Sequence, residues 1–371
     1  MARVVRRPAA PPATGRRVLF LLPAGAALLA GLDAALLLLG LPAPVSVDRL
    51  ADAHGMLLVF GFVGTLVSLE RAVALRRRAG FAAPALLGVG ALVLISPAPL
   101  AAGQALLLLG AVALTGVYVP LWRRQRDDAV LVQALGSVLA VGSLALWLGG
   151  VSVPVLLPWL AGFLVLTICG ERLELARIAM GPRAGTILTW LSAALVSATV
   201  ATLLWPAAGV PLLGLVVLVL VGWLSAHDVA RRTIRASGQP RFMAACMLAG
   251  YLWLGVAGAV WMVGGPAYAG VRYDAAVHAV FLGFTLSMIL AHASVILPAV
   301  LRRPLHHSPA FWAPVALLHG SLLLRLWVGD GLGIEFAWQL GGLANIAALL
   351  LFVALALWST VLAGARRGAV R

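Results

Sequence analysis

Four histidines lie within long apolar stretches of this chain, and their residue type makes them the first candidates for chemistry: His54, His278, His292 and His319. An ionisable side chain inside the hydrocarbon of a bilayer costs free energy, and such residues usually bind a ligand or carry protons. Imidazole is a good ligand for haem iron, and neutral histidine also suits copper. All four are therefore candidate cofactor-binding and metal-binding residues. The alternative for each is a plain hydrogen bond across a helix interface.

The composition indicates an integral membrane protein. Hydrophobic residues make up 63% of the 371 residues and charged residues only 11%, whereas a soluble chain is about a quarter charged. The net charge is +15, but the arginines occur in small groups between apolar runs and form no single patch. We therefore exclude nucleic acid as a partner and expect the lipid bilayer instead.

The apolar runs predict an all-α fold with twelve membrane-spanning helices, since each run is close to the twenty residues that cross a bilayer. They lie at about residues 18–41, 50–75, 81–101, 103–122, 129–149, 152–175, 184–205, 208–226, 241–264, 272–300, 310–329 and 335–363. No connection is long enough for a soluble domain. We expect one transmembrane domain over residues 18–363, a basic N-terminal tail at 1–17 and a short C-terminal tail at 364–371.

The arginines predict the orientation, because short cytoplasmic connections are enriched in positive charge. Arginines gather at both termini and in the even-numbered connections: residues 3–17, 76–78, 123–126, 177–183, 231–241, 302–303 and 366–367. The odd-numbered connections contain little beyond Arg49 and Arg272. Both termini are thus expected in the cytoplasm, with the protein in the inner (cytoplasmic) membrane. The first segment is too long for a cleaved signal peptide and carries Asp33.

This topology assigns depths to the histidines. The second and tenth segments both enter from outside, which places His54 about one turn below the surface and His278 about 9 Å below Arg272. These two histidines can meet. His292 and His319 both lie roughly eight or nine residues from the cytoplasmic ends of their segments, at about 1.5 Å per residue, so they can meet as well.

The spacing within the tenth segment suits two stacked cofactors. His278 and His292 are fourteen residues apart, which on a regular α-helix is about 21 Å of rise and within about 40° of the same face. This resembles b-type membrane cytochromes, in which one helix presents two axial histidines. A flat macrocycle also needs small residues nearby, and the chain supplies Gly55, Gly61, Gly64, Gly283 and Ala291, although small residues also serve helix packing.

Two Glu-Arg pairs fall at the cytoplasmic ends of the second and sixth segments: Glu70-Arg71 and Glu171-Arg172. One interpretation is a proton path that starts at a glutamate, or arginines that bind haem propionates. The other is a set of interhelical ion pairs. Three further charged residues in or near the first, eleventh and twelfth segments could be partners of one another: Asp33, Arg325 and Glu335.

The string AHGMLLVF at residues 53–60 resembles the AHGxxMxFF stretch on the second helix of haem-copper oxidase subunit I. That subunit also has twelve helices, and its tenth helix is loosely similar to His278 followed by FTLSM at 284–288. The resemblance implies that His54 and His278 are the axial ligands of one b-type haem. It implies no oxygen-reducing copper centre, because the His-Pro-Glu-Val-Tyr and His-His motifs are missing.

The chain is more similar to the NnrS family, whose members are twelve-helix membrane proteins that contain haem and copper and are linked to nitric oxide. The similarity covers mainly the second, ninth, tenth and eleventh segments, and the denser histidine clusters of NnrS proteins are absent. It implies redox chemistry or a response to nitric oxide or another diatomic gas, with an electron donor or a gas as partner. It leaves open whether the protein is a membrane oxidoreductase, and whether copper binds at His292 and His319.

A secondary transporter of a small solute is the competing class, because twelve helices with both termini inside is the commonest transporter plan. Against it, residues 1–180 and 190–371 show no convincing self-similarity. The membrane histidines also lie only in the second, tenth and eleventh segments. A structural or assembly subunit is the third class. Haem absorbance separates the haem protein from both alternatives.

Overall fold

The computed structural model describes residues 17, 19–301 and 308–368, and every regular element in these ranges is helical. Twelve of its helical spans are long and apolar enough to cross a membrane, which confirms the predicted all-α fold and the number of spans. The predicted turn at 96–99 is also found, between Ile95 and Leu100. The orientation of the spans stays a prediction.

The elements follow one another through short connections. In chain order they are α2 (Leu21–Leu38), α3 (Asp48–Met56), η1 (Leu57–Gly64), α4 (Thr65–Leu75), η2 (Arg78–Phe81), α5 (Ala82–Ile95), α6 (Leu100–Gln125), α7 (Asp128–Leu148), α8 (Val153–Met180), α9 (Ala184–Leu204), α10 (Pro206–His227), α11 (Ala230–Thr233), α12 (Gly238–Gly264), α13 (Gly270–His278), η3 (Ala279–Leu286), α14 (Ser287–Leu301), η4 (Pro309–Phe311), α15 (Trp312–Leu323), η5 (Leu324–Asp330) and α16 (Glu335–Gly368). Helix α16 thus continues beyond residue 363, where the transmembrane domain was expected to end.

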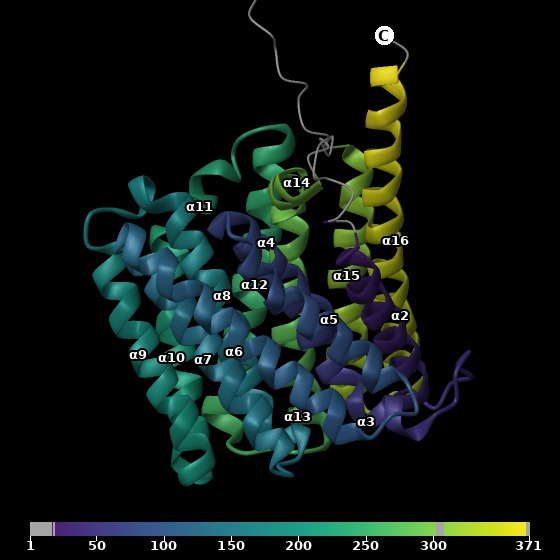
Figure 1. The fold of residues 1–371 in the computed structure, drawn as a ribbon. Helices are drawn as coiled ribbons and strands as arrows, with labels where there is room; N and C mark the ends of the chain where they lie inside the picture. Colours follow the sequence, from purple (N-terminus) through teal and green to yellow (C-terminus); the bar gives the residue numbers. More distant parts are fainter. Residues whose placement is uncertain (1–16, 18, 302–307, 369–371) are drawn as a thin grey trace, which may run out of the picture.

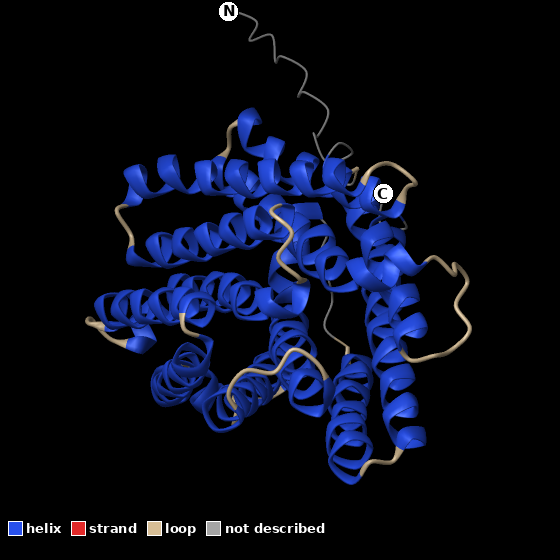
Figure 2. Cartoon of the chain, turned by 90° about the horizontal axis from the view of Figure 1, so that it is seen from below, coloured by secondary structure: helices blue, strands red, loops and turns tan. Residues whose placement is uncertain are grey.

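Helices that are neighbours in sequence pack as antiparallel neighbours, as α5 does with α6, α7 with α8 and α15 with α16. Contacts between distant segments hold these pairs together: α10 packs on α12, α14 on α4, and η3 on α8. The last helix, α16, also contacts α2. Figures 1 and 2 show the resulting bundle from the side and from one end.

Three spans form the centre of the bundle. In their most apolar stretches, 67% of the residues are buried in the span Arg49–Leu75, 78% in Val153–Met180 and 67% in Gly270–Val295, compared with 56% or less in the other nine. These three spans carry His54, His278 and His292 together with both Glu-Arg pairs. Most of the predicted site residues therefore lie on the helices that are most shielded from lipid.

The two ends of the bundle differ in chemistry. At the lower end in Figure 1, α3 and α13 bring in His54 and His278, and we call this the histidine end. The opposite end, where α4 stops and α11 lies, carries most arginines, and we call it the arginine end. Here Arg76 closes α4 in the left-handed conformation, with φ 59°, which ends a helix by turning the chain away from its axis.

Three π-helical segments interrupt the spans that carry the candidate residues. Segment η1 begins three residues after His54, η3 begins directly after His278, and η5 contains Arg325. π-Helical turns are rare and occur frequently at functional sites. The estimate that placed His278 and His292 on one face assumed a regular α-helix, and that assumption is wrong, because η3 lies between them and its i→i+5 hydrogen bonds change the winding.

Close backbone contact joins α10 to α12 at Gly214. A Cβ atom built on Gly214 would lie 2.3 Å from the backbone nitrogen of Met262 and 2.5 Å from the carbonyl oxygen of Gly258. Glycine permits this approach, as small residues do at many interfaces between membrane helices. Gly222, two turns further along α10, has no atom within 4 Å of its Cβ position.

We expect Gly214→Ala to destabilise the protein by about 1–3 kcal/mol, because the backbone of α12 has to move away from the added methyl group. Thermal unfolding of the purified protein in detergent measures the effect. Gly222→Ala on the same helix is the matched control and should be neutral or slightly stabilising, since alanine is the better helix former. Equal effects of the two changes would show that the contact at Gly214 does not limit helix packing.

Candidate functional site

His54 and His278 hold their rings in the same way at the histidine end. The Nδ1 atom of His54 lies 2.8 Å from the carbonyl oxygen of Gly31, and that of His278 lies 2.9 Å from the carbonyl oxygen of Asp274. A carbonyl only accepts, so Nδ1 is the donor in both rings, and in a neutral ring with this tautomer Nε2 carries the lone pair. Neither Nε2 atom has a hydrogen bond to a described residue. The two rings are close enough to interact electrostatically.

An ion pair that the sequence analysis missed supports His278. Oδ1 of Asp274 lies 3.2 Å from Nδ1 of His278, and both carboxylate oxygens of Asp274 accept from Arg325, at 2.8 Å each. The guanidinium of Arg325 also lies 4.8 Å from the ring centre of Trp338. The spacing of four residues between Asp274 and His278 was the available signal, since such residues lie on one face of a helix.

The expectation that Asp33, Arg325 and Glu335 pair with one another is wrong for Arg325, whose partner is Asp274. Asp33 instead accepts a hydrogen bond from the backbone nitrogen of Val45, at 3.1 Å. The sequence could not distinguish these acidic residues by charge or depth. The fold distinguishes them by placing α13 beside η5.

Of the small residues expected beside a macrocycle, two serve helix packing. A Cβ atom on Gly61 would lie 2.8 Å from the side chains of Ala27 and Ala91, and one on Gly283 would lie 2.4 Å from Trp253. Gly55, next to His54, differs because the nearest atom to its Cβ position belongs to Val153, 3.7 Å away. Gly55 therefore leaves more room than Gly61 or Gly283.

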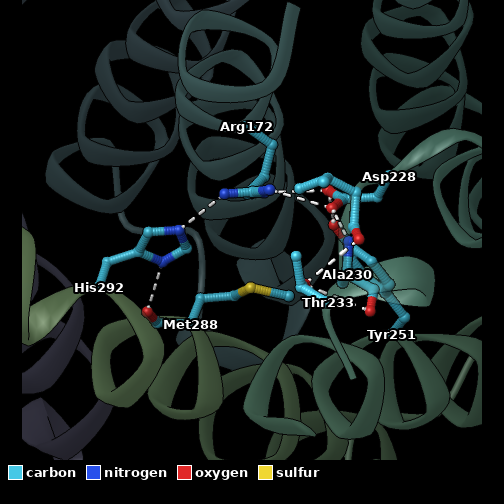
Figure 3. Close-up of polar contacts among 8 residues, drawn as sticks. Arg172, Asp228, Ala230, Thr233, Tyr251, Met288 and His292 are labelled. Carbon is cyan, nitrogen blue, oxygen red and sulfur yellow. Dashed lines mark hydrogen bonds and ion pairs between the residues drawn. The ribbon is translucent and has the colours of Figure 1, made fainter. Parts of the chain in front are cut away.

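His292 belongs to a closed network of buried polar groups (Figure 3). Arg172 lies between His292 on one side and Asp228 on the other. Its Nη1 donates to Nε2 of His292 at 3.0 Å, and its Nε and Nη2 donate to the two oxygens of Asp228, both at 3.0 Å. Tyr251 donates to the same carboxylate at 2.8 Å. All four side chains are buried, with exposed fractions of 3% or less.

This network determines the protonation of His292. Arginine only donates, so Nε2 of His292 accepts, and Nδ1 donates to the carbonyl oxygen of Met288 at 2.8 Å. His292 is thus the neutral Nδ1–H tautomer and has no free lone pair for a metal. Asp228 was overlooked in the sequence because it follows the span α10, in a region interpreted as a solvated connection.

His319 has different partners. Trp253, which only donates, gives its Nε1 hydrogen to Nδ1 of His319 at 3.0 Å, and Nε2 faces the hydroxyl of Ser287 at 3.5 Å. That hydroxyl donates to the carbonyl oxygen of Gly283 at 2.6 Å. No contact joins His319 to His292 among the described residues. The structure does not bring the second pair together as ligands.

The two Glu-Arg pairs separate at the arginine end. Arg71 binds Glu70 at 2.5 Å and Glu174 at 3.0 Å, and Glu171 lies within electrostatic reach of Arg71. Arg172 instead points to Asp228, because successive residues on a helix differ in direction by about 100°. Glu171 and Arg172 therefore belong to different clusters on two faces of α8.

The remaining histidine in the described ranges, His227, shows no sign of a site. The ring of His227 is exposed, stacks on Trp223 at 5.0 Å and hydrogen-bonds to the carbonyl oxygen of that residue. His306 and His307, predicted to be solvated, lie outside the described residues. In the part of the chain that the structure describes, no three His, Cys, Asp or Glu side chains form a group that could hold a metal ion.

Comparison with known proteins gives one match. The model of a family described as a domain of unknown function (DUF8744) matches residues 17–361. Neither a curated protein nor a solved structure matches the chain. The family match covers all twelve spans almost completely, so the histidine end and the arginine end both lie within the matched region.

We expect Asp228→Asn to destabilise the protein by about 3–5 kcal/mol, because it leaves the guanidinium of Arg172 buried without its counter-charge. The matched control is Asp127→Asn. Asp127 pairs with Arg177, whose side chain is 54% exposed, and asparagine retains the helix cap to Ala129. Its loss should be below about 1 kcal/mol. Chemical unfolding in detergent compares the two, and similar losses would contradict a stabilising role for the buried pair.

Proposed function

The chain belongs to the DUF8744 family, and we propose that it binds a b-type haem between His54 and His278, for electron transfer or for a response to a diatomic gas such as nitric oxide. One observation carries the proposal. Two histidines from distant segments lie close enough to interact electrostatically, and each has its Nδ1 bound to a carbonyl and its Nε2 without a hydrogen bond to a described residue.

This arrangement fits an axial pair. Histidines that ligate metals donate their other ring nitrogen hydrogen to a carbonyl or a carboxylate, which fixes the tautomer and the ring orientation. His54 has a carbonyl in this position, and His278 has both a carbonyl and the carboxylate of Asp274.

Arg325 is suited to bind a haem propionate. Its Nε and Nη2 hold Asp274, while its Nη1 has no hydrogen bond to a described residue. The charge of Arg325 is also close enough to His54 to interact with it. A guanidinium is the preferred partner of a carboxylate, so Arg325 would neutralise one propionate while it holds Asp274 against His278.

A bound haem would supply a one-electron redox couple. Two axial histidines leave no open coordination position, which favours electron transfer, and gas binding would require one histidine to leave. The residues of this chain would orient the two imidazoles, through Gly31 and Asp274, and shield them within the central spans. His292 and His319 have no part in this site, because Arg172 and Trp253 occupy their nitrogen atoms.

We expect the protein, purified in detergent from cells supplied with ample haem, to show a Soret band and reduced α absorption. His54→Ala and His278→Ala should each abolish or shift these bands, because each removes an axial ligand. His227→Ala is the control, since that ring is exposed, and its spectrum should be unchanged. A folded but colourless protein would refute the haem proposal, and the transporter would become the leading alternative.

We expect Asp274→Asn to retain the haem but to raise its reduction potential by tens of millivolts, where about 59 mV is a tenfold change for one electron. The carboxylate would strengthen the His278 imidazole as a ligand and so would favour ferric iron. Redox titration of the folded, haem-loaded variant measures the shift. Asp52→Asn, an exposed residue near His54, should change the potential less. An equal shift would mean that Asp274 acts only through its charge.

A further inference from the structure

Glu171 is a buried carboxylate without a partner. Its exposed fraction is 9%, and it has no hydrogen bond or ion pair to a described residue. The two arginines that interact with Glu171 are both committed elsewhere: Arg172 to Asp228, and Arg71 to Glu70 and Glu174. A buried ionised carboxylate without such a partner is strongly unfavourable, so Glu171 needs compensation that the fixed side chains do not provide.

The charges around Glu171 do not balance. Glu70, Glu171 and Glu174 lie close enough to interact with one another, and Arg71 is the one guanidinium that binds members of this group. Arg172 also interacts electrostatically with Glu171, but its positive charge is already balanced by its bidentate ion pair with Asp228. Arg177 also interacts with Glu174, but it is paired with Asp127. Among the described residues, the three carboxylates therefore share the single guanidinium of Arg71 as their ion-pair partner.

Unsatisfied polar atoms belong to the same cluster. The hydroxyl of Tyr118, Oε1 of Gln133 and Nε of Arg71 are all buried and have no hydrogen-bond partner among the described residues. Tyr118 and Gln133 are 1% and 0% exposed, and Tyr118 lies within electrostatic reach of Arg71 and all three glutamates. Gln133 donates to Glu174 at 3.4 Å. Buried polar atoms are rarely left unpaired, and an ordered water that meets two or more of them satisfies such a group.

We propose that Glu171 is protonated at neutral pH and forms, with water bound by Tyr118 and Gln133, a proton-binding site that exchanges with the aqueous phase at the arginine end. The proton comes from bulk water, adds to a carboxylate oxygen of Glu171 and leaves by the same route, so no oxidant or reductant is involved. The side chain of Glu174, 42% exposed, connects this site to the surface.

A proton fits the site better than a metal ion. Oxygen ligands would suit a hard cation, but the guanidinium of Arg71 lies among them, and the described residues contain no group of acidic and histidine side chains that could hold a metal. A protonated Glu171 is also a hydrogen-bond donor, and its cluster contains an unpaired buried acceptor, Oε1 of Gln133. The charged and titratable groups that face Glu171 are Glu70 and Arg71 on α4, Tyr118 on α6, and Arg172 and Glu174 on α8. The proposal does not depend on a haem.

The test is infrared spectroscopy of the full chain in detergent at neutral pH, as the difference between the natural protein and Glu171→Gln. We expect a carboxylic acid C=O band in the natural protein that is lost in Glu171→Gln. It should shift to lower frequency in D₂O, because the proton exchanges with water. Asp127→Asn is the control, since that carboxylate is paired with the largely exposed guanidinium of Arg177, and the band should persist in it.

A second variant keeps the test valid if Glu171→Gln folds poorly. Gln133→Leu removes the unpaired acceptor, so the band should remain but move to higher frequency as its hydrogen bond weakens. Three results would overturn the proposal: no carboxylic acid band in the natural protein, a band that survives in Glu171→Gln, or a band that does not shift in D₂O. Loss of the band on adding sodium at constant pH would identify a cation site instead.

Discussion

The bidentate ion pair between Arg172 and Asp228 determines which hydrogen bonds and ion pairs the polar groups around it can form. A guanidinium in the centre of a membrane bundle has no bulk water to solvate it, so it must find a counter-charge inside the protein. Asp228 provides both oxygens, and Tyr251 and the backbone nitrogen of Ala230 complete the hydrogen bonds of that carboxylate. Two consequences follow, on two different faces of α8. Nη1 of Arg172 donates to His292 and makes its Nε2 an acceptor. Arg172 is also not available as an ion-pair partner for Glu171, its neighbour in the sequence.

A second bidentate ion pair, between Arg325 and Asp274, also determines how a neighbouring histidine is held, at the histidine end. Here the histidine is contacted by the carboxylate of the pair and not by its guanidinium. Asp274 uses its side chain and its carbonyl to hold Nδ1 of His278, and nothing in the described structure occupies Nε2. The same residue type therefore has two chemistries in one protein. An arginine donor occupies Nε2 of His292, whereas His278 is oriented by acceptors at Nδ1 and its Nε2 has no hydrogen bond to a described residue. This contrast, rather than depth in the bundle, distinguishes a candidate ligand from a structural histidine.

The π-helical segments are a further link between the fold and the site. η3 lies between His278 and His292 and changes the direction in which the second ring points, so one span can serve the Asp274 site at one end and the Arg172 network at the other. η1 similarly separates His54 from the Glu70-Arg71 pair. In both spans the interruption allows polar residues near the two ends to face different neighbours.

The sequence by itself determined the class of the protein, the number of spans and the set of polar residues in the central helices. Apolar runs near twenty residues are sufficient for this, because the thickness of the bilayer fixes the length of a spanning helix. Spacing also placed His54 and His278 at one end. Partner choice was beyond the sequence, since it depends on directions around each helix axis, which π-helical turns alter, and on contacts such as α14 with α4 and α13 with η5. Only the tertiary structure therefore showed that Arg325 pairs with Asp274, that Arg172 closes His292, and that Glu171 lies beside Tyr118.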